Sequence, residues 1–574
     1  SSRRRHTRYW RDWSSDVCSS DLAVHVGASA GAASRDEAVK RRATSPVVRA
    51  STARSSATLA VGAFASRIAG WARITVLVAV FGATGALDPF LAAFRIPDIV
   101  FALVAAGSIS TVLVPQLSAL LERGERRRAR RLVGSVLVAM LLLLGAVSIV
   151  VVLGAATFSG LLVSGLPAAQ QREAADLSVI LLVATVALAL SAVCTSAAGA
   201  RSQFGVTAIT GLVYSAGTIA GALIGGREAG GYGPAVGTAA GALAVLSIAG
   251  TVLMRSVLRP ALPNFRDPLL REALRSLLPR VGSVLVVQLL LAYLIGLAGT
   301  TGPGAITVWS YAFTLLQVPL ALVTSSIGIA ILPKVAAQAA RGNIEGIRRL
   351  ATSSIGTVIW LMAPIASLGA LFAFDAVRLV IGGSVEDAGA AATSDLLRIL
   401  LVGLVAHGVI SVAVRLFYGL RDTARPTLAE LGGSLVIFVL ATLWVPMSGV
   451  IGIAAALPLG TWIEALLLIG LLSRGRGVLG AARVASMVLF SVAAALLSTL
   501  IAAAVTLPVI EGARSLGILP AAAVAAFGTA LGLVAYLTLT LVARREEALP
   551  LLRRIAPVAP RALRQVLLRA EATE

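Results

Sequence analysis

The sequence predicts an all-α membrane protein that crosses the bilayer many times. Of the 574 residues, 57% are hydrophobic and only 13% are charged. Apolar runs long enough to span a bilayer follow one another along most of the chain. These runs are continuous, whereas membrane β-strands alternate apolar and polar residues, so we expect helices.

The charge pattern supports the same fold class. The formal net charge is +22, which can indicate a nucleic-acid partner. Here, however, the arginines fall in short loops between apolar runs, so we expect no nucleic acid. The two cysteines, Cys18 and Cys194, are far apart and suggest neither a disulfide framework nor a metal site. No phosphate-binding loop, zinc spacing or catalytic triad is present. We therefore expect a transporter without a cofactor, not an enzyme.

The two ends of the chain differ from its apolar body. Residues 1–22 resemble a translated sequencing adapter and are excluded from the fold prediction, with a native basic leader as the alternative. Residues 23–56 are rich in Ala, Ser and Arg without periodicity, so 1–56 is predicted to be a disordered tail. Residues 544–574 are predicted to form a short basic tail.

We expect about fourteen spanning segments between these tails. They lie near 57–81, 86–120, 133–164, 174–199, 203–225, 234–257, 276–299, 304–335, 349–374, 393–419, 426–446, 449–472, 484–507 and 517–542. Loops after even-numbered segments are rich in arginine, as in the stretch ERGERRRARR that begins at Glu122. The positive-inside rule then places these loops and both termini in the cytoplasm.

An internal repeat divides the segments. Ser108–Leu132 aligns without a gap to Ser326–Leu350, an offset of 218 residues (326 minus 108). We therefore predict two parallel six-helix halves around a central cavity, 57–258 and 276–473, joined by a cytoplasmic linker at 259–275. Two additional helices follow in 474–543. Transporters built from such repeats bind substrate between the halves.

The first segment carries two arginines at membrane depth, Arg67 and Arg73. Each costs about 2.5–3.5 kcal/mol there unless it faces protein or water. Ser66, Gly70 and Arg73 share one helical face, with Arg67 beside it. This small, cationic face favours a cavity that binds an anion, because guanidinium groups suit phosphate. An internal salt bridge is the alternative.

The second segment places Asp88 and Arg95 on one face. The two side chains could simply pair, or both could line the cavity. Arg415 in the tenth segment could line it too, or extend to the cytoplasmic interface. Glu430 and Glu464, in segments eleven and twelve, are candidates for binding a coupling ion or proton. His407 is expected to be a packing residue.

Three stretches resemble the MurJ/MviN family of lipid II flippases. Ser66–Arg73 with Phe81-Gly82-Ala83 is similar to that family's first helix, and Leu87–Pro97 is similar to its second. Phe417–Thr427 resembles its F-Y-A-L-x-D-T-x-T-P motif. The resemblance covers about residues 57–543.

The resemblance implies translocation of lipid-linked peptidoglycan precursor across a bacterial inner membrane, with cavity arginines contacting the diphosphate. That role carries over to Arg67 and Arg73, and Asp88 matches the family's second-helix aspartate. It also implies that a monomer suffices, with membrane lipids and cell-wall synthesis proteins as further partners.

The chain departs from the family pattern at three places. Ile74 replaces an aspartate, Phe101-Ala102 replaces an arginine pair, and Ser310–Leu315 lacks the arginine of the family's Y-Y-A-D-R-L stretch. Three alternatives to a lipid II flippase therefore stay open: a flippase for another polyprenyl-diphosphate glycan, a drug or cation antiporter, and a scaffold that transports nothing.

Overall fold

The computed structural model describes residues 62, 65–66, 68–82, 85–105, 109–162, 165–201, 205–381, 387–474 and 477–543. Over these residues the protein is an all-helical, multi-pass membrane protein. After a helix at Ile68–Phe81, the elements are η1 (Gly85–Leu87), α3 (Asp88–Ala93), α4 (Arg95–Ala105), α5 (Ile109–Glu122), α6 (Arg126–Leu162), α7 (Ala168–Gly199), α8 (Gly205–Gly225), α9 (Tyr232–Met254), α10 (Pro268–Gly299), α11 (Ala305–Ala340), α12 (Ile344–Leu371), α13 (Ala373–Ile381), α14 (Asp387–Leu401), α15 (Leu404–Gly419), α16 (Ala424–Ser448), α17 (Val450–Arg474), α18 (Ala481–Leu516) and α19 (Ile518–Ala543).

Among the described residues, ten helices are long and apolar enough to cross a membrane, or twelve if two bent helix pairs each count as one span. One bent pair joins Ile68–Phe81 to Gly85–Ala102 at 118°. The predicted count of about fourteen treats these two arms as separate spans. It also adds α10, whose apolar part is the shorter Val284–Gly299. That count stays a prediction.

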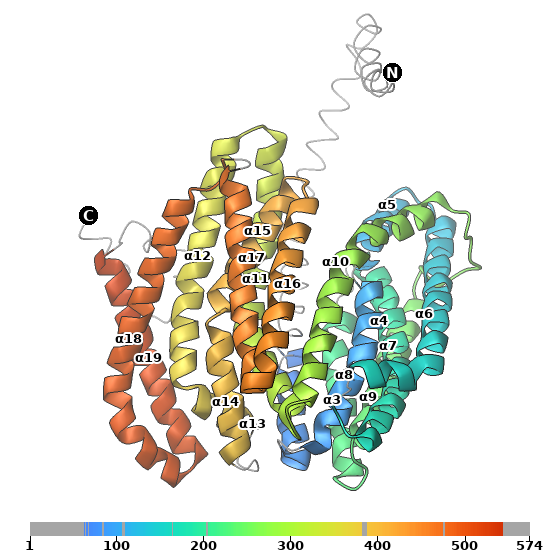
Figure 1. Cartoon of the computed structure of the whole chain (residues 1–574). Helices are drawn as coiled ribbons and strands as arrows, with labels where there is room; N and C mark the ends of the chain where they lie inside the picture. The colour runs from blue at the N-terminus through green and yellow to red at the C-terminus, as the bar shows by residue number, and fades with distance from the viewer. Residues whose placement is uncertain are drawn as a thin grey trace, which may run out of the picture.

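The helices form two bundles (Figure 1). One contains α3 to α9 and the other contains α11 to α19. Helix α10 runs between them and packs on both α4 and α16. It begins at Pro268, inside the stretch predicted to be linker. The bundles approach each other at the end where α3 and η1 contact the beginning of α11.

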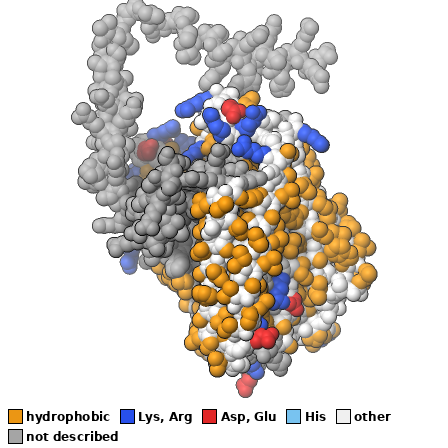
Figure 2. All heavy atoms as spheres, turned by 90° about the vertical axis from the view of Figure 1, so that its left-hand side faces the viewer, with side chains coloured by type: hydrophobic (Ala, Val, Ile, Leu, Met, Phe, Trp, Pro, Cys, Tyr) orange, Lys and Arg blue, Asp and Glu red, His pale blue; other side chains and the backbone are white. Residues whose placement is uncertain are grey.

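The outer surface has the composition of a lipid-facing surface. Figure 2 shows a broad apolar area over the C-terminal helices, with basic side chains gathered at one end of the molecule. Leu500 on α18 and Phe527 on α19 are 66% and 60% exposed. Such a large contiguous apolar area is typical of a membrane-embedded surface.

Glycines bring two helices of the first bundle into close contact. Helices α8 and α9 lie so close that a Cβ atom built on Gly221 would be 2.3 Å from the Gly233 carbonyl oxygen. A Cβ atom on Gly237 would be 2.3 Å from the Gly217 carbonyl oxygen. Small residues at such spacing let membrane helices approach closely and gain dispersion energy.

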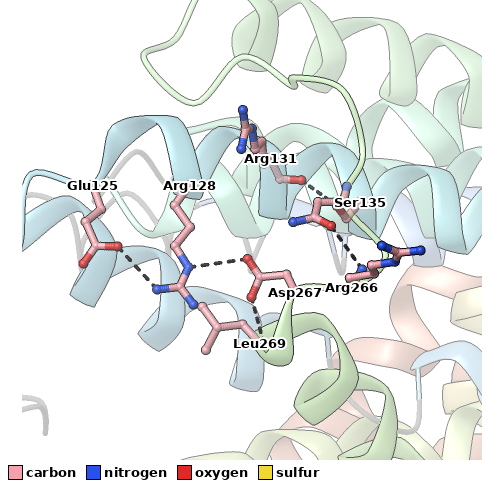
Figure 3. Close-up of polar contacts among 8 residues, drawn as sticks. Glu125, Arg128, Arg131, Ser135, Arg266, Asp267 and Leu269 are labelled. Carbon is pink, nitrogen blue, oxygen red and sulfur yellow. Dashed lines mark hydrogen bonds and ion pairs between the residues drawn. The ribbon is translucent and has the colours of Figure 1, made fainter.

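The stretch that joins the two halves is held against α6 (Figure 3). The Ser135 hydroxyl accepts a hydrogen bond from the Asn264 amide at 2.7 Å. The Arg128 guanidinium lies 3.4 Å from the Asp267 carboxylate. Asp267 also caps the first turn of α10, because its side chain accepts a hydrogen bond from the Leu269 amide at 3.0 Å. The beginning of α10 is thereby attached to the first bundle.

The aligned repeat segments make the same contacts in both halves. Gly124 and Gly342, separated by the repeat offset, both have positive φ angles, 75° and 64°. The Arg130 Nε donates to the Arg259 carbonyl at 3.1 Å, and the Arg348 Nε donates to the Gly477 carbonyl at 3.1 Å. Both pairs are 129 residues apart. These contacts are equivalent at the aligned positions, and the division into two repeated halves stays a prediction.

An ion pair joins the last two helices, α18 and α19, to the rest of the second bundle. Arg514 on α18 donates two hydrogen bonds to the Asp375 carboxylate on α13, at 2.9 and 2.7 Å. Asp375 is 3% exposed. The Arg514 guanidinium also lies 5.0 Å from the Phe374 ring centroid.

Replacing Arg514 by alanine is expected to lower the free energy of unfolding by about 3 kcal/mol, because it leaves a buried carboxylate without its partner. Thermal unfolding in detergent would measure this loss. Arg398→Ala is the matched control: its partner Asp395 is largely exposed, so we expect a loss of less than about 1 kcal/mol. Equal losses in the two variants would contradict the prediction.

Candidate functional site

A cavity of about 440 Å³ lies where the two bundles meet. The Ile68–Phe81 helix, α3, α4 and α8 form one wall, and α10 and α11 form the other. Its described lining residues are Arg73, Ile74, Leu77, Phe90, Leu91, Phe94, Arg95, Asp98, Tyr214, Thr218, Gln288, Leu291, Ile295, Trp309, Ser310, Tyr311, Phe313, Thr314 and Gln317. A polar, partly cationic cavity within an apolar protein is a natural substrate site.

Arg73 reaches this cavity from the first helix, as predicted. Its guanidinium carbon lies 5.5 Å from the ring centroid of Tyr214 on α8, a cation–π arrangement. None of the ion pairs between described residues involves Arg73. The aromatic ring therefore orients the cation, which interacts with Asp98 in the same cavity without forming an ion pair with it.

Arg95 also lines the cavity, but its partner is not Asp88. Its guanidinium lies 3.2 Å from the Asp98 carboxylate, one turn further along α4. The expectation that Asp88 and Arg95 could pair is therefore wrong. Arg95 Nε is buried and has no hydrogen-bond partner among the described residues, so the side chain keeps a donor for a ligand. Asp98 was missed, although its i+3 spacing from Arg95 was the available signal.

Asp88 joins the two bundles and is absent from the described cavity lining. Its buried carboxylate accepts hydrogen bonds from the Gly304 amide at 2.7 Å and the Thr307 amide at 2.9 Å. It also accepts one from the Thr307 hydroxyl at 2.6 Å. Asp88 thus caps the amino end of α11, where the helix dipole favours a negative charge. The structure thus shows this residue in a contact between helices.

Ser66 packs against α8, because a Cβ atom built on Gly211 would lie 2.7 Å from the Ser66 Cβ. It is not among the described lining residues. Arg67 lies outside the residues that the structure describes. Arg415 on α15 is half-buried and donates to the Ser411 carbonyl at 2.7 Å, also contacting the Ser411 hydroxyl. It too is absent from the described cavity lining.

The two glutamates lie on neighbouring helices, away from the cavity lining. Glu430 on α16 and Glu464 on α17 are both half-buried. The Glu464 carboxylate oxygen would be 3.3 Å from a Cβ built on Gly433. No group of three His, Cys, Asp or Glu side chains among the described residues is arranged to hold a metal ion. The buried His407 Nε2 has no hydrogen-bond partner within the described part of the chain.

Solved structures share this architecture. The structure titled "Lipid II flippase MurJ, inward closed conformation" matches with a TM-score of 0.69 at 18% identity, covering 85% of this chain and 99% of that one. An inward-facing multidrug resistance MATE family transporter matches with a TM-score of 0.61 at 15% identity, covering 73% and 95%. At these identities, the matches show a shared fold alone.

Sequence comparisons are more specific. Lipid II flippase MurJ of Burkholderia cenocepacia is 26% identical over 428 residues, which is 71% of this chain and 82% of that protein. A Bdellovibrio bacteriovorus protein named "Probable lipid II flippase MurJ" is 25% identical over 425 residues, covering 72% and 81%. The family model described as "Lipid II flippase MurJ" matches residues 77–519, most of the chain. The chain therefore belongs to the lipid II flippase MurJ family, as the resemblance of its first two helices had indicated.

Proposed function

We propose that this protein moves lipid II, the undecaprenyl-diphosphate-linked peptidoglycan precursor, from the inner to the outer leaflet. The observation that carries this proposal is the pair of arginines in the cavity between the bundles. Two guanidinium groups on one wall suit a diphosphate, which accepts bidentate hydrogen bonds. Family membership supplies the lipid-linked precursor as the substrate class.

Arg73 is the principal anion-binding group in this proposal. Arg95 forms an ion pair with Asp98 at 3.2 Å, whereas Arg73 lies over the Tyr214 ring and is more distant from Asp98, which still acts on its charge. Arg67 is proposed as an additional contact, with Ser66 helping to shape the helix surface. Arg415 is retained as a weaker proposal, since its described contacts are with its own helix. The undecaprenyl chain would remain in lipid.

Transport by alternating access requires that one end of the cavity close while the other opens. The cavity is closed at the beginning of α11, because Asp88 of the first bundle caps that end of α11 in the second bundle. In addition, a Cβ on Gly165 would lie 2.2 Å from the Thr300 amide nitrogen. The arginine-rich loops lie at the other end of the helices, so the positive-inside rule places the closed end outside. This is the arrangement expected for loading from the cytoplasm.

Several further properties belong to the same proposal. Both termini are cytoplasmic in a bacterial inner membrane, and a monomer suffices. Glu430 and Glu464 bind the coupling ion or proton, away from the substrate cavity. Cell-wall synthesis proteins are the expected partners at the outer leaflet, because they consume the translocated precursor.

The direct test is complementation. A bacterium depleted of its own lipid II flippase should regain viability and externally accessible lipid II when it expresses residues 23–574. An epitope tag on the expressed chain would verify that it is inserted in the membrane. Failure of a well-inserted chain to rescue would contradict the proposal.

A second candidate is a flippase for another polyprenyl-diphosphate glycan. The observation that favours it is Thr314, which lines the cavity at the position where the family resemblance leads one to expect an arginine. Rescue of a surface-polysaccharide flippase mutant, without rescue of lipid II transport, would select it.

A cation antiporter is disfavoured because Asp98 is the only acid among the described lining residues. A scaffold would keep its function after the cavity arginines are neutralised.

A further inference from the structure

The two walls of the cavity differ in charge. All charged side chains among the described lining residues come from the first bundle: Arg73, Arg95 and Asp98. The facing wall, α10 and α11, contributes no charged side chain among the described lining residues; its polar groups are Ser310, Tyr311, Thr314, Gln288 and Gln317, beside apolar and aromatic side chains. A substrate that fills the cavity therefore meets an anion site on one side and neutral hydroxyl and amide groups on the other.

Two hydroxyl groups on the α11 wall have no hydrogen-bond partner in the part of the chain that the structure describes. The Ser310 Oγ and Tyr311 Oη atoms are buried and make no hydrogen bond with any described residue. Tyr311 as a whole is only 3% exposed. The neighbouring Thr314 differs, because its hydroxyl donates to the Ser310 carbonyl at 2.7 Å. Burying an unsatisfied hydroxyl is unfavourable, so a ligand group that completes these bonds would gain affinity.

Aromatic rings flank these hydroxyls. Trp309 and Phe313, one turn apart on α11, stack with their ring centroids 5.7 Å apart and their planes at 17°. On the opposite wall, Phe90 and Phe94 meet edge to face at 5.0 Å. All four residues line the cavity. Trp309 and Phe90 are only 2% and 1% exposed, so the half-buried rings of Phe313 and Phe94 are the ones that can contact the C–H face of a pyranose ring.

We propose that the α11 wall is a sugar-binding subsite, in which Ser310 and Tyr311 hydrogen-bond the glycan while Arg73 holds the diphosphate. This inference rests on the proposed function and adds which part of the substrate each wall recognises. It also accounts for Thr314: the anion is bound from one bundle only, so a second cation on α11 is not needed. The specificity of the protein for its glycan then resides in α11.

The test uses the full chain in lipid nanodiscs and two probes. One is farnesyl diphosphate, and the other is farnesyl diphosphate that carries a single N-acetylhexosamine on its terminal phosphate. The Ser310→Ala, Tyr311→Phe double variant should bind the sugar-bearing probe about tenfold more weakly, because it loses two hydrogen bonds. Its affinity for farnesyl diphosphate should change by less than about twofold. Arg73→Gln should weaken the binding of both probes.

Tyr293→Phe is the matched control. It removes a tyrosine hydroxyl that bonds to Thr442 and is not among the described lining residues, so neither affinity should change. Thermal unfolding of the ligand-free protein adds a second readout. Tyr311→Phe should unfold at the same or a higher temperature, since it removes an unsatisfied buried group, whereas a structural tyrosine would lower that temperature.

The outcomes separate the two proposals. Equal weakening of both probes by the double variant, or a lowered unfolding temperature with unchanged affinities, would overturn the sugar subsite alone. If the unmodified protein bound neither probe, the lipid II proposal would be overturned, and the sugar subsite with it.

Discussion

Replacement of Arg73 by alanine is expected to reduce transport by roughly 100-fold or more. A guanidinium group that binds a diphosphate contributes two charge-assisted hydrogen bonds, each worth about 1.5–3 kcal/mol. Arg95 cannot substitute fully, because Asp98 lies 3.2 Å from its guanidinium. The measurement is the rate at which externally accessible lipid II appears in cells depleted of their own flippase.

Two variants make this result specific. Arg73→Lys keeps the charge but loses the planar, bidentate geometry, so it should transport at an intermediate rate. Arg341→Ala removes an exposed arginine from a loop and should transport like the unmodified protein. Because Arg73 makes none of the ion pairs between described residues, its loss should not lower the unfolding temperature. Normal transport by Arg73→Ala at equal expression would exclude it from the site.

Replacement of Asp88 by alanine is expected to open the end of the cavity that is closed in this structure. Its carboxylate accepts three hydrogen bonds from Gly304 and Thr307 on the other bundle. Losing about 3 kcal/mol of this interaction would shift the balance between closed and open states by about 100-fold. Transport should fall as well, because alternating access requires that both states be populated.

Thiol labelling from outside the cell would measure this opening. The reporter is Ser310→Cys, which lines the cavity, in a chain whose Cys18 and Cys194 are replaced by alanine. A membrane-impermeant maleimide should label it faster when Asp88 is alanine. Asp176→Ala is the matched control, since Asp176 bonds to Tyr232 within one bundle. Equal labelling rates in all variants would mean that Asp88 caps α11 without controlling closure.

The sequence by itself determined the fold class and the cationic first helix. Apolar runs predicted a helical membrane protein, because backbone groups in lipid must be bonded within the segment. The cost of a buried charge predicted that Arg73 faces a cavity, and the structure places it there. The repeat alignment matched Gly124 to Gly342, and both glycines have a positive φ angle in the structure.

Only the tertiary structure decided which helices meet across that cavity. Helical periodicity shows that Asp88 and Arg95 share a broad face, but it does not show what lies opposite them. In the structure, Asp88 bonds to Gly304, 216 residues away in the chain, whereas Arg95 pairs with Asp98 on its own helix.

The tertiary structure also decided the environment of the uncharged polar side chains on the α11 wall. Its residue types could be read from the sequence. The burial of the Ser310 and Tyr311 hydroxyls, without a partner among the described residues, depends on the packing of α11 against the first bundle. Local spacing fixes the face of a helix on which a side chain lies, because it depends only on backbone geometry. The partner of that side chain depends on contacts between distant segments, which form only when the bundles assemble.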